Sequence, residues 1–168
     1  MSENPPRYEH GEWLSASDCP QQLANDPAAL FRYWAELAKE QGAPTRAQID
    51  PLTHFPRLMP TTILLGIERD AERGLRYRYR VVGSELTRRA GRELTGKYLD
   101  ECFPPERIQA DLGIYRRCID EQVCYWGSRT SVVEEREAWE TYNRIILPIR
   151  DAATGSVDYL WIYIWFNR

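Results

Sequence analysis

The sequence predicts an α+β protein in which helices cover an antiparallel sheet. Two observations carry this prediction. First, turn signals and apolar periodicity indicate a helix, two strands, a block of helices and then three strands along the 168 residues. Second, the stretch 159–166 alternates Tyr or Trp with Leu, Ile or Phe, so both faces of a strand formed there would be apolar. A strand with two apolar faces is typical of the middle of a sheet that is covered on both sides.

The chain begins with a polar segment, residues 1–26, whose apolar side chains are few, and we expect it to be an extended or partly disordered tail. Asp26-Pro27 then marks the start of a helix that continues to about residue 41, followed by a proline-rich connector to residue 60. This helix is amphipathic and needs a partner surface, either a sheet face of the same chain or a second copy. We expect it to form a homodimer or partner interface through Phe31, Trp34 and Leu37.

The remainder of the chain, residues 61–168, contains the predicted sheet. A glycine-containing turn separates strands at 61–68 and 75–82, which predicts a hairpin. Strict alternation in the second strand places Leu75, Tyr77, Tyr79 and Val81 on one face and the arginines on the other. The further elements are short helices at 84–90 and 98–103, a longer helix from Pro105 to about Gln122, and strands at 123–133, 142–149 and 157–166.

Two stretches carry a resemblance to a known family. They run from Arg78 to Leu86 and from Gly91 to Leu99, and together with the order of elements they resemble PAS sensor domains. The segment Ile49-Asp50-Pro51 is similar to the one that precedes the first strand in a group of small, single-domain bacterial PAS proteins. This resemblance implies a five-stranded antiparallel sheet in the order 2-1-5-4-3, helices on one face, and a small cavity beneath them. The terminal strand is central in that order, as its residues indicate independently.

A PAS arrangement also implies which residues bound the cavity. Aromatic side chains are the stronger candidates, because small-molecule pockets have mostly apolar walls with a few polar groups. Arg80 and Arg89 are the choices for a polar ligand, since a guanidinium pairs well with carboxylate or phosphate. For each aromatic residue, simple packing in the core is the alternative, and the sequence leaves open which face of 159–166 lines the cavity. The aromatic candidates are Tyr77, Tyr79, Tyr98, Tyr115, Trp126, Tyr142 and Trp161.

The sequence lacks the motifs of several cofactor sites and enzymes. The motif that surrounds the reactive cysteine of flavin photosensors is absent, and the two histidines lie in apparent loops, so neither haem nor photoactive flavin is expected. Cys102 and Cys118 are expected to be core thiols, and no metal site is predicted. Enzyme motifs are absent, and the acidic run Glu134, Glu135, Glu137 and Glu140 is expected to be a solvated hairpin tip.

The composition limits the kinds of partner that we expect. A net charge of −3 gives no sign of nucleic-acid binding, and the sequence shows no spanning or signal segment, so we expect a cytoplasmic protein. The predicted function is a stand-alone PAS-type sensor or adaptor that binds a small molecule, a protein partner, or both. The chain ends two residues after the last strand, so a signalling protein would act in trans. The alternatives are a ligand-free interaction module and, from another class, a small cavity enzyme of the isomerase or hydratase type.

Overall fold

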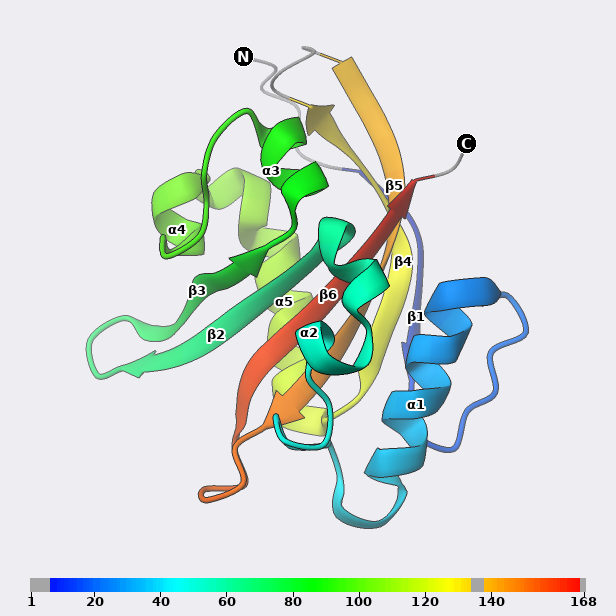
Figure 1. Cartoon of the computed structure of the whole chain (residues 1–168). Helices are drawn as coiled ribbons and strands as arrows, with labels where there is room; N and C mark the ends of the chain where they lie inside the picture. The colour runs from blue at the N-terminus through cyan, green and yellow to red at the C-terminus, as the bar shows by residue number, and fades with distance from the viewer. Residues whose placement is uncertain (1–6, 134–137, 167–168) are drawn as a thin grey trace.

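The computed structural model describes residues 7–133 and 138–166. Within these residues, six strands form one antiparallel sheet in the order β1-β4-β5-β6-β2-β3, and helices lie on both of its faces (Figure 1). The strands are β1 (Arg7–Leu14), β2 (Thr62–Asp70), β3 (Gly74–Val82), β4 (Cys124–Val133), β5 (Ala138–Arg150) and β6 (Val157–Phe166). The helices are α1 (Asn25–Gln41), α2 (Pro51–His54), the 3-10 helix η1 (Pro56–Thr61), α3 (Ser84–Ala90), α4 (Leu99–Cys102) and α5 (Pro105–Glu121).

The last strand, β6, is central. It pairs with β5 on one side and with β2 on the other, and its middle residues are buried on both faces of the sheet. The order β3-β2-β6-β5-β4 is the one that the PAS resemblance implies, so the predicted fold class is confirmed. The observed sheet adds a sixth strand, β1, at the edge beside β4.

That sixth strand corrects the predicted polar tail. Residues 7–14 pair with β4, the Trp13 ring lies 5.0 Å from the Tyr125 ring, and Leu14 is buried. The segment has too few apolar residues to predict a strand by itself. An exposed sheet edge supplies ready backbone hydrogen-bond partners, however, so two apolar anchors are sufficient to hold a strand there.

Helix α1 covers one face of the sheet. Its buried stripe packs with side chains of β5 and β6, and the Trp34 indole Nε1 donates a hydrogen bond of 2.9 Å to the carbonyl oxygen of Pro148. Phe31 and Trp34 are 1% and 0% exposed, and Leu37 is half-buried. The sheet of the same chain thus takes up this stripe. Phe31 and Trp34 offer no exposed side chain to a second copy, and the expected interface through them is corrected.

The opposite face of the sheet packs against α4 and α5. Leu160, Ile162 and Ile164 of β6 point to this side, whereas Trp161 and Tyr163 point toward α1. The question that the sequence left open is therefore answered. The Leu/Ile face of β6 lies on the side of the middle helices, and the Tyr/Trp face lies under α1.

A bulge in β3 changes the predicted alternation. Leu64 is paired with Val81, but the next residue, Leu65, is paired with Tyr79, so Arg80 is an extra residue in the ladder. Tyr79 belongs to the core on the α5 side, and Val81 packs on the α1 side. The prediction that Tyr79 and Val81 share a face was wrong, because a bulge shifts the register by one residue and reverses every side chain beyond it.

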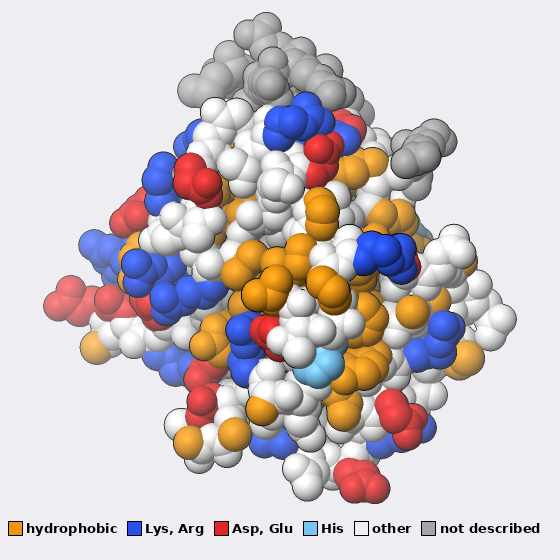
Figure 2. Space-filling view, viewed as in Figure 1, with side chains coloured by type: hydrophobic (Ala, Val, Ile, Leu, Met, Phe, Trp, Pro, Cys, Tyr) orange, Lys and Arg blue, Asp and Glu red, His pale blue; other side chains and the backbone are white. Residues whose placement is uncertain are grey.

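The surface on the α1 side is mixed. Figure 2 shows hydrophobic side chains gathered over the middle of this face, around the α2–η1 segment, with arginine and acidic side chains interspersed over the β2–β3 hairpin. In the described part of the chain, no helix has the length and apolar character needed to cross a membrane.

Candidate functional site

A cavity of about 180 Å³ lies between the sheet and helices α3, α4 and α5. Most of its wall is apolar: Ile162 and Ile164 of β6 form part of it, and Leu86, Leu99 and Phe103 contribute from the helical segments. Protein interiors are normally close-packed, with few voids larger than a water molecule. A hollow of this size within the core is therefore the first candidate for a ligand site.

The local structure explains why these side chains converge. In β6 the period of two brings alternate residues to the cavity, and in α5 the spacing of three and four residues brings Ile108, Asp111 and Tyr115 to one side of the helix. The bulge at Arg80 allows both Tyr79 and Val82 of β3 to face the cavity. The side chains that each element contributes to the cavity wall are thus set by the periodicity of that helix or strand.

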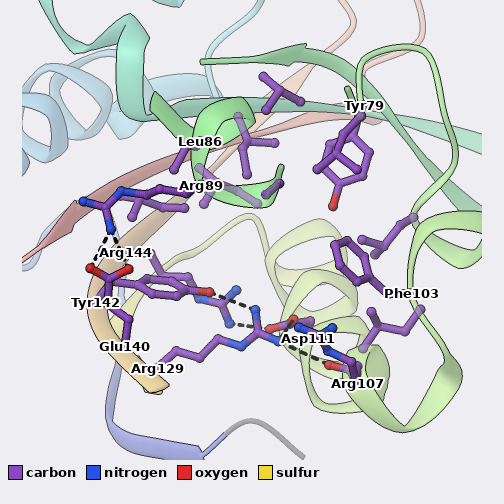
Figure 3. Close-up of a pocket in the computed structure, with 18 of the residues that line it drawn as sticks. Tyr79, Leu86, Arg89, Phe103, Arg107, Asp111, Arg129, Glu140, Tyr142 and Arg144 are labelled. Atoms are coloured by element: carbon purple, nitrogen blue, oxygen red, sulfur yellow. Dashed lines mark hydrogen bonds and ion pairs between the residues drawn. The ribbon is translucent and has the colours of Figure 1, made fainter. Parts of the chain in front are cut away.

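One end of the cavity holds a cluster of buried charges, shown at the bottom of Figure 3. Arg144 of β5 donates a hydrogen bond of 2.5 Å from Nη2 to Oδ1 of Asp111 on α5, and Arg129 of β4 forms an ion pair with Oδ2 at 3.2 Å. Arg129 also donates from Nη1 to the hydroxyl of Tyr142 at 2.9 Å and from Nη2 to the carbonyl oxygen of Arg107 at 3.2 Å. The cluster ties two strands to helix α5.

The burial of this cluster is deep: Arg144 and Asp111 are each 3% exposed. Charges removed from water are tolerated only when they are paired and hydrogen-bonded. Here two guanidinium groups contact the two oxygens of one buried carboxylate, Arg144 at Oδ1 and Arg129 at Oδ2.

A second ion pair lies at another part of the wall. Arg89 of α3 contacts Glu140 of β5 at 2.5 Å and Glu85 at 2.8 Å, and its guanidinium lies 3.6 Å from the centre of the Phe166 ring. Hydrogen bonds from Arg88 and Arg89 lower the pKa of Glu85 to about 2. This group of contacts fixes α3 against β5.

Glu140 corrects the interpretation of the acidic run as a solvated hairpin tip. Its side chain is 25% exposed, lines the cavity and pairs with Arg89. The other members of the run, Glu134, Glu135 and Glu137, lie outside the described residues. Among the described residues, Glu140 thus represents this run, and its side chain points into the cavity.

Tyr79 provides the cavity with a polar group. Its side chain is 5% exposed and its hydroxyl points into the hollow (Figure 3). Within the described residues, no side chain or backbone group forms a hydrogen bond with this hydroxyl. Burial, together with nearby groups including Asp111, raises the pKa of Tyr79. The hydroxyl therefore keeps its proton at neutral pH and can donate a hydrogen bond.

Four of the nine predicted site residues meet at this cavity: Tyr79, Arg89, Tyr115 and Tyr142. The other five lie elsewhere, so those five expectations are corrected.

Two of the misplaced candidates are tryptophans on the α1 side. Trp161 donates from Nε1 to the Thr62 hydroxyl at 3.4 Å, and Trp126 donates from Nε1 to Glu12 at 3.1 Å. Both follow from strand parity, because their positions on β6 and β4 face away from the cavity. The sequence shows which residues of a strand share a face, but only the packing of the helices shows which face lines the cavity.

The other three belong to β3 and the segment after it. Tyr77 packs against Tyr115 within the core but does not line the cavity. Arg80, the bulge residue, turns outward and forms an ion pair with Glu68 at 3.1 Å. Tyr98 follows β3 in the chain, and its hydroxyl donates a hydrogen bond to the same carboxylate. These contacts place all three outside the hollow.

Sequence reasoning missed the buried charges Asp111, Arg129 and Arg144. A faint signal was present for Asp111, because it occupies the helical stripe between Ile108 and Tyr115 where an apolar residue is expected. For the arginines no local pattern distinguishes an inward from an outward side chain. The cluster becomes visible only when three elements are brought together.

Cys102 and Cys118 behave as core thiols, as expected. Cys102 and Cys118 are buried, burial raises the pKa of both, to about 12 for Cys118, and neither lines the cavity. A reactive cysteine needs thiolate character, which burial in apolar surroundings suppresses. Among the residues that the structure describes, no group of three or more metal-binding side chains is gathered.

Comparison with known proteins supports this architecture. A family model described as a PAS domain matches residues 24–161. The chain belongs to the PAS domain family. A search of curated proteins finds no match.

One solved structure is similar to this PAS domain and is described as that of an RNA-binding light-oxygen-voltage receptor. It matches with a TM-score of 0.50 and 12% sequence identity, and the match covers 96% of this chain and 39% of that protein. At this identity the likeness supports the fold alone.

Proposed function

We propose that this PAS domain is a sensor that binds a small molecule in the cavity between its sheet and helices α3–α5. Binding alters the helices around the cavity, and a signalling protein that acts in trans reads the change. The observation that carries the proposal is a hollow of about 180 Å³ between the sheet and the helices, into which the hydroxyl of Tyr79 points. A ligand in this hollow can accept a hydrogen bond from the hydroxyl, and one such bond contributes about 0.5–1.5 kcal/mol.

The strand β6 offers a route for the signal. Ile162 and Ile164 line the cavity, whereas Trp161 and Tyr163, which alternate with them along the strand, pack on the side of α1. A ligand that displaces the cavity face of β6 also displaces the support of α1. Because close-packed cores transmit small shifts rather than absorb them, we propose that α1 and its surroundings report occupancy to the partner.

A cavity enzyme of the isomerase or hydratase type is the second candidate. The observation in its favour is a carboxylate, Asp111, in a cavity lined by Tyr79, Tyr115 and Tyr142. Both oxygens of Asp111 are engaged by guanidinium groups, and this arrangement favours a structural role over proton transfer. The sensor is therefore our first choice.

Native mass spectrometry of protein purified under mild conditions tests the proposal. We expect a mass above that of the denatured chain by the mass of one small molecule, or a shift of the same kind after incubation with cell extract. A molecule recovered unchanged supports a sensor, whereas chemical conversion on incubation supports the enzyme. Equal native and denatured masses under all these conditions would favour an interaction module without a ligand.

A further inference from the structure

We infer that the cavity binds an uncharged molecule about the size of a single aromatic ring, with a hydrogen-bond acceptor that faces the hydroxyl of Tyr79. This inference rests on the proposed ligand-binding function and specifies the chemistry of the ligand. Three observations carry it: the volume of the hollow, the contacts that already engage the charged side chains of its wall, and the direction of the Tyr79 hydroxyl.

The volume of the hollow limits the size of the ligand. It is about 180 Å³, close to the roughly 150 Å³ of an engineered apolar cavity that binds benzene. It is also below the roughly 300–1,000 Å³ of pockets that hold drug-sized molecules. A molecule of one ring, or of a similar number of atoms, therefore fits this space. The apolar surface that such a molecule would contact comes from Leu99, Phe103, Ile108, Ile162 and Ile164.

The buried charges at one end of the hollow are engaged with one another. Arg144 donates a hydrogen bond to Oδ1 of Asp111, and Arg129 contacts Oδ2, so both oxygens of this carboxylate are in contact with a guanidinium. Arg129 also donates a hydrogen bond to the hydroxyl of Tyr142. A charged ligand at this end would lose its hydration and would compete for groups that are already bound to one another, and both effects disfavour it.

The other charged side chains of the wall are paired as well. Arg89 contacts the carboxylates of Glu85 and Glu140. Arg92 donates a hydrogen bond of 2.7 Å to a backbone carbonyl oxygen of α4, and the guanidinium of Arg107 lies over an aromatic ring of the wall. Within the described part of the chain, every charged side chain that lines the hollow thus has a partner. An uncharged ligand can enter without breaking any of these contacts.

Tyr79 supplies a hydrogen-bond donor at a fixed position. Figure 3 shows its hydroxyl directed into the hollow, away from the ion pairs. The bulge at Arg80 sets the direction of the side chain, and the Tyr79 backbone exchanges hydrogen bonds with Lys97, at 2.9 Å, and Gly96, at 2.7 Å. Burial raises the pKa of this hydroxyl, so it carries its proton at neutral pH. A carbonyl or ether oxygen is the kind of ligand group that accepts a hydrogen bond from it.

The first test varies the charge and the size of the probe. Binding to the wild-type protein is measured by ligand-observed NMR and calorimetry for acetophenone, ethylbenzene, benzoate and benzylamine, four single-ring molecules of similar size. We expect acetophenone to bind at least tenfold more tightly than benzoate or benzylamine, because the two charged probes leave water without gaining a free counter-charge. The two-ring ketone 2-acetonaphthone should bind at least tenfold more weakly than acetophenone, because it exceeds the hollow.

The second test removes the hydroxyl. In Tyr79→Phe the affinity for acetophenone is expected to fall about three- to tenfold, the range that one hydrogen bond contributes. The affinity for ethylbenzene, which has no acceptor, should stay at the wild-type value, so the two probes together separate the hydrogen bond from a change in shape. Tyr77→Phe is the matched control: it lies on the same strand and in the same core but outside the cavity, and both affinities should equal those of the wild type.

The third test locates the bound probe. Ala90 lines the hollow at the end of α3 and is half-buried, so a larger side chain there would occupy the space. Ala90→Phe is expected to lower the affinity for acetophenone at least tenfold. Thr87→Phe is the control, because it adds the same ring to the same helix at a position that does not line the hollow, and it should bind acetophenone as the wild type does.

The outcomes separate this inference from the proposed function. If benzoate or benzylamine binds as tightly as acetophenone, the cavity binds ligands but does not select uncharged ones. If Tyr79→Phe weakens acetophenone no more than ethylbenzene, the hydroxyl is not the anchor, and if Ala90→Phe binds as the wild type does, the probe lies elsewhere. A retained natural molecule that is charged or larger than one ring contradicts the inference and leaves the sensor function standing. If none of the probes binds and native mass spectrometry finds no retained molecule, the proposed sensor function itself is overturned.

Discussion

Replacing Trp34 by alanine is expected to lower the free energy of unfolding by about 3–5 kcal/mol. Trp34 is fully buried between α1 and the sheet, and its indole Nε1 donates to the carbonyl oxygen of Pro148. The substitution opens a large cavity in this core and leaves that carbonyl without its donor. Urea denaturation followed by far-ultraviolet circular dichroism measures the change.

The control for this prediction is Arg32→Ala, on the exposed side of the same helix. Its free energy of unfolding should stay within about 0.5 kcal/mol of the wild type. Light scattering on the folded proteins should give one and the same oligomeric state for wild type and Trp34→Ala. A variant that keeps its stability but changes its oligomeric state would instead mean that Trp34 serves an interface, as the amphipathic pattern first indicated.

The strand β6 shows how far the sequence could predict this fold. Its doubly apolar alternation indicated a central strand, and the sheet order confirms that position. Which face meets the cavity could not be predicted, because Trp161 and Ile162 are equally suited to burial. That choice depends on which helices pack on each side, and only the assembled fold contains this information.

Two backbone features could not be predicted from the sequence for a related reason. The strand β1 is stabilised by its pairing with β4, and the bulge at Arg80 is a property of the ladder between β2 and β3. Neither feature has a distinctive local composition. Sequence periodicity describes single elements well, but it misses structure that arises from the pairing of two.

The candidate site was only partly predictable for the same reason. Aromatic residues on correctly predicted elements gave Tyr79, Tyr115 and Tyr142. The Asp111 cluster joins residues 18 and 33 positions apart. Buried charges are normally read as surface residues, so their convergence becomes visible only in three dimensions.

Replacing Asp111 by alanine is the second change with a large expected effect. It leaves Arg129 and Arg144 facing each other without their shared carboxylate, and Arg144 is 3% exposed. Loss of one partner from a buried ion pair destabilises a protein by about 3–5 kcal/mol, because an uncompensated charge remains buried. The free energy of unfolding in urea should fall by that amount.

Asp120→Ala provides the matched control, since Asp120 lies on the same helix and pairs with Arg116 in solvent. Such an exposed pair contributes about 0.3–0.5 kcal/mol, so the two variants should differ by several kcal/mol. The double variant Asp111→Leu with Arg144→Met should recover much of the loss, because apolar residues of similar volume can replace a buried pair at little cost. If Asp111→Ala were no worse than Asp120→Ala, the cluster would not depend on its carboxylate, and its role in tying β4 and β5 to α5 would have to be abandoned.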